Sequence, residues 1–355
     1  MVKFSGLPEP LEPRRLRERA LPFALLFAFA LLLRVAAVWI GAGPGARPEG
    51  GAVAIEQAAW SLANDHGLAT GEAFERTPTA SVPPLTPWLT SLAYRAFGRG
   101  YLAALLAQAL LAALIPLLIA RLGAPLFGGA IGFAAGILAA ADPVLLDAGR
   151  ALRAESVLTI ALLWAMIVAI EWVRAPSGRR EYWTGIAFGV AVLAHPAALA
   201  LPFVTMAWAW VPLGLMLEPR TVRRQMLYLA GGLAVVVAPW MLRNLLVMGV
   251  IAPVTSGAPP FEGTDLAAGL GVWLPWWALL LPLALWGVAR VLRGARRIFQ
   301  SYPLVMIGIL AAAAFVLWGS FFARLPIEPL VVLFAAAGGE DAWRRWRTRG
   351  ARAAT

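Results

Sequence analysis

The 355-residue chain has no cysteine, only two histidines and few charged residues. Without thiols it can form neither disulfides nor a thiolate nucleophile, and cysteine-based metal sites are excluded. Asp, Glu, Lys and Arg together make up only 14% of the residues, whereas 61% are hydrophobic. With a mean hydropathy of +0.75, the composition lies far outside the range of soluble domains. It is the composition of an integral membrane protein.

Apolar runs of about 20 residues recur along the chain, which is typical of transmembrane helices and not of the short alternating strands of a barrel. We therefore predict an all-α polytopic membrane protein with about ten transmembrane helices. His195 and Pro196 interrupt one apolar run and leave open whether it is one broken helix or two. The predicted spans are 20–42, 100–120, 127–144, 154–173, 182–194, 197–217, 227–248, 270–289, 302–320 and 325–339.

Positive charge is unevenly distributed between the ends of these spans. An even number of spans puts both termini on one side, and 21 of the 30 Lys and Arg residues then lie on that side. By the positive-inside rule this side is cytoplasmic. We expect a multi-pass protein of the inner membrane, with both termini in the cytoplasm: a basic N-terminus at 1–19, a membrane domain at 20–340 and a basic tail at 341–355. The net charge of +11 then reflects topology and contact with lipid headgroups, and we expect no nucleic acid partner.

The longest polar stretch is "AIEQAAWSLANDHGLATGEAFERTPTASVPP", residues 54–84, within a predicted outer loop at 43–99. A loop far longer than a simple connection usually carries a function. Ile55, Ala59, Leu62 and Ala63 recur at helical spacing, which predicts a short amphipathic helix lying on the membrane surface.

Four arginines lie near the predicted outer face, at Arg150, Arg153, Arg243 and Arg324. An unpaired arginine at that depth costs a few kcal/mol, so their presence needs a reason. One interpretation is a basic pocket for an anion such as a lipid phosphate. The other is that Arg150 and Arg153 pair with Asp147 and Glu155 one helical turn away, while the remaining two cap helix ends or reach toward the interface.

Several segments together resemble a known family. They are "LLLRVAAVWI", "WSLANDHGLAT", "RTPTASVPPLTPWLTSLAYRAFG", "LAQALLAALIPLLIARL", "LRAESVLTIALLWA", "VLAHPAALALP", "APWMLRNLLVMG" and "ARLPIEPLVVLFAAAG". In this order, and across residues 28–340, they resemble the membrane-embedded glycosyltransferases of the protein-mannosyltransferase and aminoarabinose-transferase type, glycosyltransferase family 39, which have a GT-C fold. The resemblance implies a GT-C-like transmembrane domain.

The resemblance also implies a reaction. The donor would be a polyprenyl-phosphate sugar, transferred with inversion on the outer face to an acceptor that the sequence does not identify, in glycosylation of a cell-envelope glycan, lipid or protein. A carboxylate would take the proton of the acceptor hydroxyl, and cations would stabilise the departing phosphate. The family's Asp in the first outer loop has no counterpart here, because Gly51 or Ala52 stands in its place. Glu49 or Glu56 could reach a similar position if the loop follows another path.

The site residues follow from the same resemblance. Glu155 matches an acidic position in the second outer loop, so we expect it to orient the acceptor or to act as base, with Glu56 and Glu49 as the other catalytic candidates. The expected ligands of the donor phosphate are Arg324, Arg150, Arg243 and Arg153. The expected further cavity residues are His195, which replaces the family's usual Arg, together with Asp147 and Trp60. No metal-binding pattern is present, and since the lipid-linked sugar is a substrate, no cofactor is expected.

Two other functions remain open. A degenerate GT-C relative could bind polyprenyl lipid or scaffold a glycan-assembly complex, and the missing Asp motivates that hypothesis. A transporter or flippase usually has ionisable residues near the bilayer midplane and inverted repeats. In this sequence Arg34 is the only charge well inside a predicted span, and no segment of the first half recurs in the second.

Overall fold

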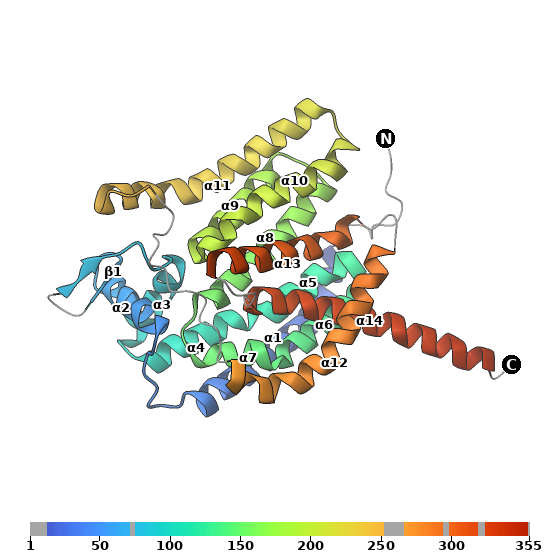
Figure 1. Cartoon of the computed structure of the whole chain (residues 1–355), viewed down its shortest axis with the longest axis horizontal. Helices are drawn as coiled ribbons and strands as arrows, with labels where there is room; N and C mark the ends of the chain where they lie inside the picture. Colours follow the sequence, from blue (N-terminus) through green and yellow to red (C-terminus); the bar gives the residue numbers. More distant parts are fainter. Residues whose placement is uncertain (1–12, 72–74, 252–265, 294–297, 319–323, 354–355) are drawn as a thin grey trace.

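The computed structural model describes residues 13–71, 75–251, 266–293, 298–318 and 324–353 and is almost entirely helical (Figure 1). It confirms an all-α membrane protein. The helices and strands are α1 (Pro13–Gly41), α2 (Gly51–Ala63), β1 (Ala69–Thr70), β2 (Thr77–Pro78), α3 (Leu85–Phe97), α4 (Tyr101–Ala112), α5 (Leu114–Phe127), α6 (Gly129–Ala141), α7 (Pro143–Asp147), the 3₁₀ turn η2 (Ala148–Arg150), α8 (Ala154–Arg174), α9 (Arg179–Ala194), the 3₁₀ turn η3 (Pro196–Ala200), α10 (Leu201–Gly214), α11 (Pro219–Met248), α12 (Leu266–Leu292), α13 (Ile298–Trp318) and α14 (Arg324–Ala353).

Each predicted span falls on a helix, but the number of crossings is not confirmed. Within the described residues, five helical segments are long and apolar enough to cross a membrane, or six if the bent pair of α6 with α7 and η2 is one span. The break at His195 is also real, because α9 ends at Ala194 and η3 begins at Pro196. The proline removes a backbone donor and ends the helix there.

The helical bundle has two chemically different ends. At one end lie α2, the β1 and β2 hairpin and α3; we call it the polar-loop end. The opposite end, where α8 finishes at Arg174 and α11 begins at Pro219, carries most of the arginines; we call it the basic end. Figure 1 shows α2, α3 and β1 on one side of the molecule and the C-terminal part of α14 projecting away on the other.

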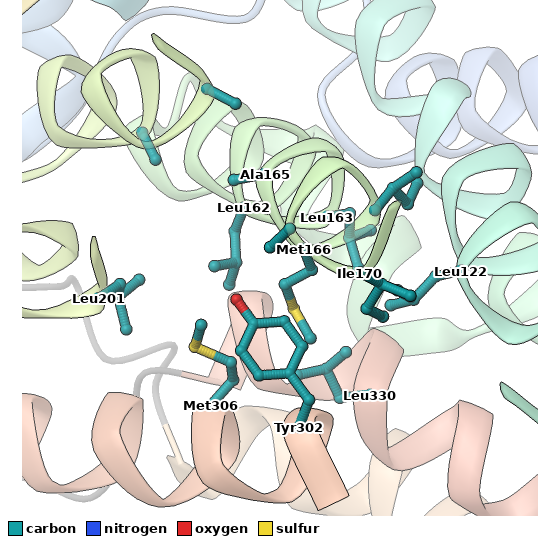
Figure 2. Close-up of a cluster of buried hydrophobic side chains, with 14 of the residues drawn as sticks. Leu122, Leu162, Leu163, Ala165, Met166, Ile170, Leu201, Tyr302, Met306 and Leu330 are labelled. Carbon is teal, nitrogen blue, oxygen red and sulfur yellow. The ribbon is translucent and has the colours of Figure 1, made fainter. Parts of the chain in front are cut away.

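The core is built around α8. Of the apolar stretch of α8, 78% is buried inside the protein, compared with 22% of the apolar stretch of α1 and 28% of that of α11. α8 is therefore central, and α1 and α11 present wide faces to the lipid. Figure 2 shows Tyr302 of α13 among Leu162 and Met166 of α8 and Leu330 of α14. The Tyr302 hydroxyl lies 2.8 Å from Thr205 Oγ1, which satisfies both polar groups within an apolar environment.

Glycines allow two pairs of helices to pack with their backbones in contact. On α11, a Cβ at Gly232 would collide with the carbonyl oxygen of Tyr182 on α9, and on α9 one at Gly185 would collide with that of Leu229. Gly338 of α14 is equally close to the backbone of α12. In a membrane, where lipid is as apolar as a side chain, such small-residue contacts supply much of the packing energy.

The predicted loop helix is present as α2, but its apolar face is turned toward the protein. Ile55 and Ala59 are buried in a cluster that also contains Val38 of α1, Leu105 of α4 and Tyr94 of α3. The β1 and β2 hairpin follows, pairing Ala69 with Pro78 and Thr70 with Thr77. The described part of the polar stretch, 54–71 and 75–84, is therefore a layer packed on the end of the bundle.

Residues 1–12 of the predicted N-terminal segment lie outside the described residues. α14 runs without a break from Arg324 to Ala353, so one helix contains both the last predicted span and most of the predicted basic tail.

Candidate functional site

The segment 142–156 brings four of the ten predicted site residues together at the polar-loop end: Asp147, Arg150, Arg153 and Glu155. Asp142 begins α7 as its N-cap, and its Oδ1 accepts hydrogen bonds from the backbone N–H groups of Val144 (2.9 Å) and Leu145 (3.0 Å). Pro143 at the first helical position needs no partner for a backbone N–H. After η2 the chain is extended at Ala151, and Arg153 is the N-cap residue of α8.

Two side chains of α4 hold this segment in place. Gln108 is buried; its Nε2 donates to the carbonyl oxygens of Ala148 (3.2 Å) and Ala151 (2.8 Å), and its Oε1 accepts from the backbone N–H of Arg153 (2.8 Å). The Tyr101 hydroxyl accepts from the backbone N–H of Leu152 at 3.0 Å. Because an extended connection has no helical partners for its backbone, these four bonds fix its path.

The charged side chains of the segment lie in different environments. Arg150 forms an ion pair with Asp147 at 3.1 Å, so the predicted pairing of these two residues is present, and 56% of the Arg150 side chain is exposed. It passes over the end of α1, where a Cβ at Gly41 would come within 2.6 Å of its Nε. Arg153 and Glu155 are both partly buried. Glu155 lies in the first turn of α8, where the helix dipole stabilises a carboxylate.

On α2, Glu56 pairs with Arg99, an arginine that was not predicted as a site residue. The guanidinium of Arg99 donates to both carboxylate oxygens, from Nε to Oε1 at 2.9 Å and from Nη2 to Oε2 at 3.0 Å. Arg99 also lies 5.5 Å from the centre of the Trp60 ring, which in turn packs edge-on against Tyr94. Burial raises the pKa of Tyr94 above its ordinary value, and the nearby Glu56 carboxylate adds to the shift. Glu56 and Trp60 thus form one packed cluster between α2 and α3.

Glu49, Gly51 and Ala52 lie at the start of α2. Glu49 is exposed just before the helix, and its carbonyl oxygen accepts from the backbone N–H of Ala52 at 3.1 Å. Gly51 and Ala52 begin α2, so the position of the family's Asp falls at the first turn of this helix. A helix N-terminus is a favourable place for an anion, but the first turn of α2 contains no acidic residue.

Arg243 joins the end of α11 to the polar layer. Its Nη1 donates to the carbonyl oxygen of Thr79 at 2.8 Å and its Nη2 to that of Leu68 at 2.9 Å, and the guanidinium lies 5.0 Å from the ring centre of Trp240. The two carbonyls belong to the residues just before β1 and just after β2. In this structure Arg243 therefore fastens the hairpin to the bundle.

His195 is buried in the break between α9 and η3, and burial lowers its pKa to about 3. A neutral imidazole is therefore expected there at physiological pH, so His195 does not replace the charge of an arginine. Arg324 is the first residue of α14, and its side chain lies outside what the structure describes.

A buried polar junction below this layer was not among the predicted sites. Asp142 Oδ2 accepts from the indole N–H of Trp276 (2.8 Å), and Glu328 accepts from that of Trp277 (3.1 Å). Arg34 of α1 is fully buried, and its Nη1 lies 3.3 Å from the carbonyl oxygen of Ala30. The sequence contains only weak signals for this junction, because its residues have more common structural explanations. An Asp before Pro is typical of a helix N-cap, and tryptophans at span ends are typical of an aromatic belt.

The described residues contain no group of three or more His, Cys, Asp and Glu side chains that could hold a metal ion. The chemistry available at the polar-loop end is that of arginine and carboxylate. Arg150, Arg153 and Glu155 lie within six residues of each other on a segment held by hydrogen bonds from the buried Gln108 side chain. Such a segment can bind an anion and offer a carboxylate to a proton.

The arrangement of helices defines a membrane-embedded protein of the GT-C fold. Among solved structures, the chain is similar to the oligosaccharyltransferase AglB from Archaeoglobus fulgidus in complex with an inhibitory peptide and a dolichol-phosphate, with a TM-score of 0.62 and 14% identity over 96% of this chain and 52% of that one. It is also similar to ArnT from Cupriavidus metallidurans bound to undecaprenyl phosphate, with a TM-score of 0.63 and 18% identity over 89% of this chain and 59% of that one. The chain thus spans little more than half the length of these structures.

The sequence comparisons agree with the fold. Residues 81–242 match the family described as dolichyl-phosphate-mannose-protein mannosyltransferase, a range that includes Gln108, the 142–156 segment and most of α11. No curated protein matches the chain in sequence. The chain therefore has the GT-C fold, and its residues 81–242 are similar to the protein-mannosyltransferase family.

Proposed function

We propose that this chain transfers a sugar from a polyprenyl-phosphate donor to an acceptor on the outer face of the inner membrane, with both termini in the cytoplasm and with inversion at the anomeric carbon. The observation that supports this most is the segment 148–155, in which Arg150, Arg153 and Glu155 are held together by Gln108 inside the family-matched region. The AglB and ArnT structures are described with dolichol-phosphate and undecaprenyl phosphate bound, which favours a lipid-linked donor here.

The proposed reaction is a single displacement. The oxygen of the acceptor hydroxyl forms a bond to the anomeric carbon while the bond from that carbon to the phosphate oxygen breaks. Glu155 takes the hydroxyl proton, and the polyprenyl phosphate leaves as an anion that Arg150 and Arg153, with Arg324, stabilise. Charge-assisted hydrogen bonds from arginine to phosphate are among the strongest available in proteins, and they strengthen as charge develops on the leaving group.

Glu155 is preferred to Glu56 as the base for a geometric reason. Both oxygens of Glu56 accept from the Arg99 guanidinium, so neither is free to accept the proton of an acceptor hydroxyl. Glu56 would have to part from Arg99 before it could take a proton efficiently. Glu49 is exposed at the loop surface, where nothing excludes water from the carboxylate.

The contact between Glu56 and Arg99, together with Gly51 and Ala52 at the family's Asp position, also favours a second candidate function. A chain that lacks the family's first-loop Asp, and whose Glu56 is paired with Arg99, could keep the lipid-phosphate site without catalysing transfer. It would then bind polyprenyl lipid or act within a glycan-assembly complex.

The test uses the full chain purified in detergent and a panel of radiolabelled polyprenyl-phosphate sugars, with binding and sugar release measured separately. Glu155→Gln is compared with Glu171→Gln, a matched control at the opposite end of the same helix α8, where Glu171 pairs with Arg121. Release that is lost only in Glu155→Gln supports the transferase. Binding without release, in wild type as well, supports the second function, and release unaffected by Glu155→Gln refutes the proposed base.

A further inference from the structure

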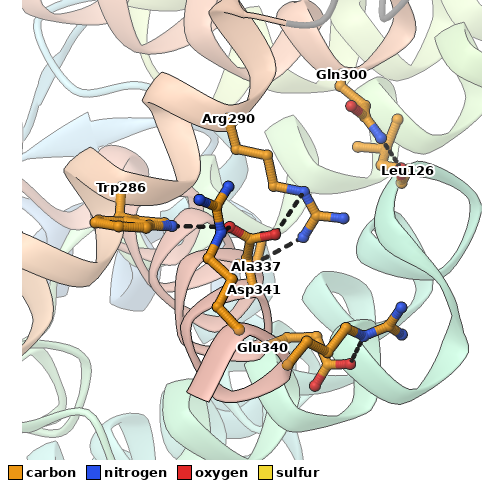
Figure 3. A network of polar contacts seen from close by, with 9 residues as sticks. Leu126, Trp286, Arg290, Gln300, Ala337, Glu340 and Asp341 are labelled. Atoms are coloured by element: carbon orange, nitrogen blue, oxygen red, sulfur yellow. Dashed lines mark hydrogen bonds and ion pairs between the residues drawn. The ribbon is translucent and has the colours of Figure 1, made fainter. Parts of the chain in front are cut away.

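The C-terminal part of α14 leaves the bundle from a firmly built base. Asp341 accepts from the indole N–H of Trp286 (2.9 Å) and pairs with Arg345 (2.8 Å), and Arg290 of α12 lies 3.9 Å from its other oxygen. Figure 3 shows Trp286, Arg290 and Asp341 converging between α12 and α14. With Gly338 packed on the α12 backbone just before this point, the direction of α14 is fixed where it emerges.

Immediately beyond this base is an exposed aromatic and basic surface. Trp343 is 53% and Trp346 65% exposed, and their rings stack with centroids 5.0 Å apart. The guanidinium of Arg347 lies 6.0 Å from the Trp343 ring centre. Residues three and four apart share one helix face, so these three side chains form one surface. Two large exposed indoles on a soluble extension would be costly, so an occupant is expected.

The position of this surface along α14 matches the boundary of a bilayer. A hydrocarbon layer about 30 Å thick needs about 20 helical residues at 1.5 Å each. Counted from Arg324, the first residue of α14, such a stretch ends close to Trp343. Trp346 and Arg347 then fall in the headgroup layer, where indole rings and arginine are both stabilised.

The neighbouring face of α12 continues the surface into the hydrocarbon. Leu281 is 43% exposed and Leu285 is 59% exposed, whereas Leu280 of the same helix is 3% exposed. Trp286 follows these leucines and carries Arg345 over its ring at 5.4 Å. Leu281 and Leu285 lie one helical turn apart, so they form an apolar strip that leads up to the aromatic and basic surface.

The charges on α14 indicate that a lipid bound at this surface has a negatively charged headgroup. Asp341 is the last acidic residue of the chain, and five arginines follow it at 344, 345, 347, 349 and 352. Arg344 pairs with Glu340 and Arg345 with Asp341, whereas within the described part of the chain no ion pair neutralises Arg347. A second copy would bring the same positive helix against itself, so an isologous contact at this surface is disfavoured.

We propose that this surface is a binding site for an anionic phospholipid, whose phosphate contacts Arg347, whose glycerol region packs on Trp343 and Trp346, and whose acyl chains follow Leu281 and Leu285 of α12. The site is separate from the polar-loop end and does not depend on the proposed transferase activity. It gives the basic end a lipid specificity beyond the general attraction of positive loops to an anionic leaflet.

The test is native mass spectrometry of the delipidated full chain titrated with phosphatidylglycerol or phosphatidylcholine. Wild type is expected to retain phosphatidylglycerol in preference, and Arg347→Gln to lower that preference about five-fold, as expected for one arginine near a headgroup layer. Trp343→Ala with Trp346→Ala is expected to weaken retention of both lipids. The matched control is Arg220→Gln with Arg223→Gln, two exposed arginines at the basic end of α11.

Thermal unfolding in detergent is measured for each variant, and unchanged midpoints show that the substitutions act on binding and not on folding. An equal loss in the α11 control would refute the proposal, since the effect would then be one of net charge. A wild type that retains both lipids equally would refute it, as would a dimer that forms through this surface and is lost in the tryptophan variants. Competition by inorganic phosphate alone would show that the acyl chains contribute nothing and would overturn the lipid assignment.

Discussion

Replacing Gln108 by leucine tests whether the buried amide positions the segment that carries Arg153 and Glu155. Leucine has nearly the volume of glutamine but can neither donate nor accept a hydrogen bond. The substitution therefore removes all three bonds to the 148–153 connection, at the carbonyls of Ala148 and Ala151 and at the N–H of Arg153. The rest of α4 keeps its contacts.

The expected magnitude follows from the groups left behind. A buried polar group that loses its partner costs about 1–3 kcal/mol, and the bonds to Ala151 and Arg153 are only part-buried, so water can replace some of what is lost. The three losses together should destabilise the segment by about 3 kcal/mol. Since about 1.4 kcal/mol corresponds to a factor of ten, the Arg153 amide should exchange on the order of 100-fold faster with solvent.

Hydrogen exchange measured by mass spectrometry on peptides covering 148–155 checks this expectation. Gln225→Leu is the matched control, because Gln225 is similarly buried and accepts one bond from the indole of Trp172 far from the segment. The control should leave exchange at 148–155 unchanged. If Gln108→Leu leaves it unchanged as well, the amide does not hold the segment and the reasoning fails. If exchange rises while sugar transfer is unaffected, the segment is not part of the site.

Three further predictions concern stability. Gly232→Ala should destabilise the chain by about 1–3 kcal/mol, because the new methyl group meets the Tyr182 carbonyl. The control Gly231→Ala, where a Cβ would meet nothing within 4 Å, should be neutral or stabilising by up to about 1 kcal/mol. Midpoints of thermal unfolding in detergent distinguish the two variants. Arg243→Gln should release the β-hairpin that its guanidinium holds through two backbone carbonyls, at a cost of about 2 kcal/mol, and limited proteolysis should then cut first within residues 68–84. The pKa of His195 is about 3 in the folded chain and about 6.5 in the unfolded chain. The free energy of unfolding should therefore fall as the pH drops through 6.5, by about 2 kcal/mol between pH 7.5 and pH 5. If His195→Asn shows the same pH dependence as wild type, this prediction is contradicted.

The sequence predicted the fold because the bilayer constrains it so strongly. Apolar length alone identified a helix for every predicted span, and the break at His195 followed from the proline next to it. The number of crossings could not be derived in the same way. A 13-residue helix such as α6 is long enough to span the membrane only together with the bent segment after it. The angle of that bend cannot be predicted from hydropathy.

The candidate site was predictable only where its contacts are local in sequence. The pairing of Arg150 with Asp147 was one of two interpretations of the arginines near the outer face, and it is present, between residues three apart in sequence. The pairing of Glu56 with Arg99 spans 43 residues and two helices, so no pattern along the chain could reveal it. The contacts of Arg243 with the hairpin, across more than 160 residues, were hidden for the same reason.

These long-range contacts change what the missing Asp means. Had Glu56 been free, the loss of a carboxylate at Gly51 or Ala52 would have been easily compensated one turn further along α2. Because Arg99 occupies both oxygens of Glu56, the proposed chemistry depends instead on Glu155, whose position depends on Gln108 through the N–H of Arg153. A single buried amide on α4 therefore decides between the two proposed functions: if it sets Glu155 against an acceptor the chain can transfer a sugar, and if it only orders the arginines the chain can bind the lipid phosphate and go no further.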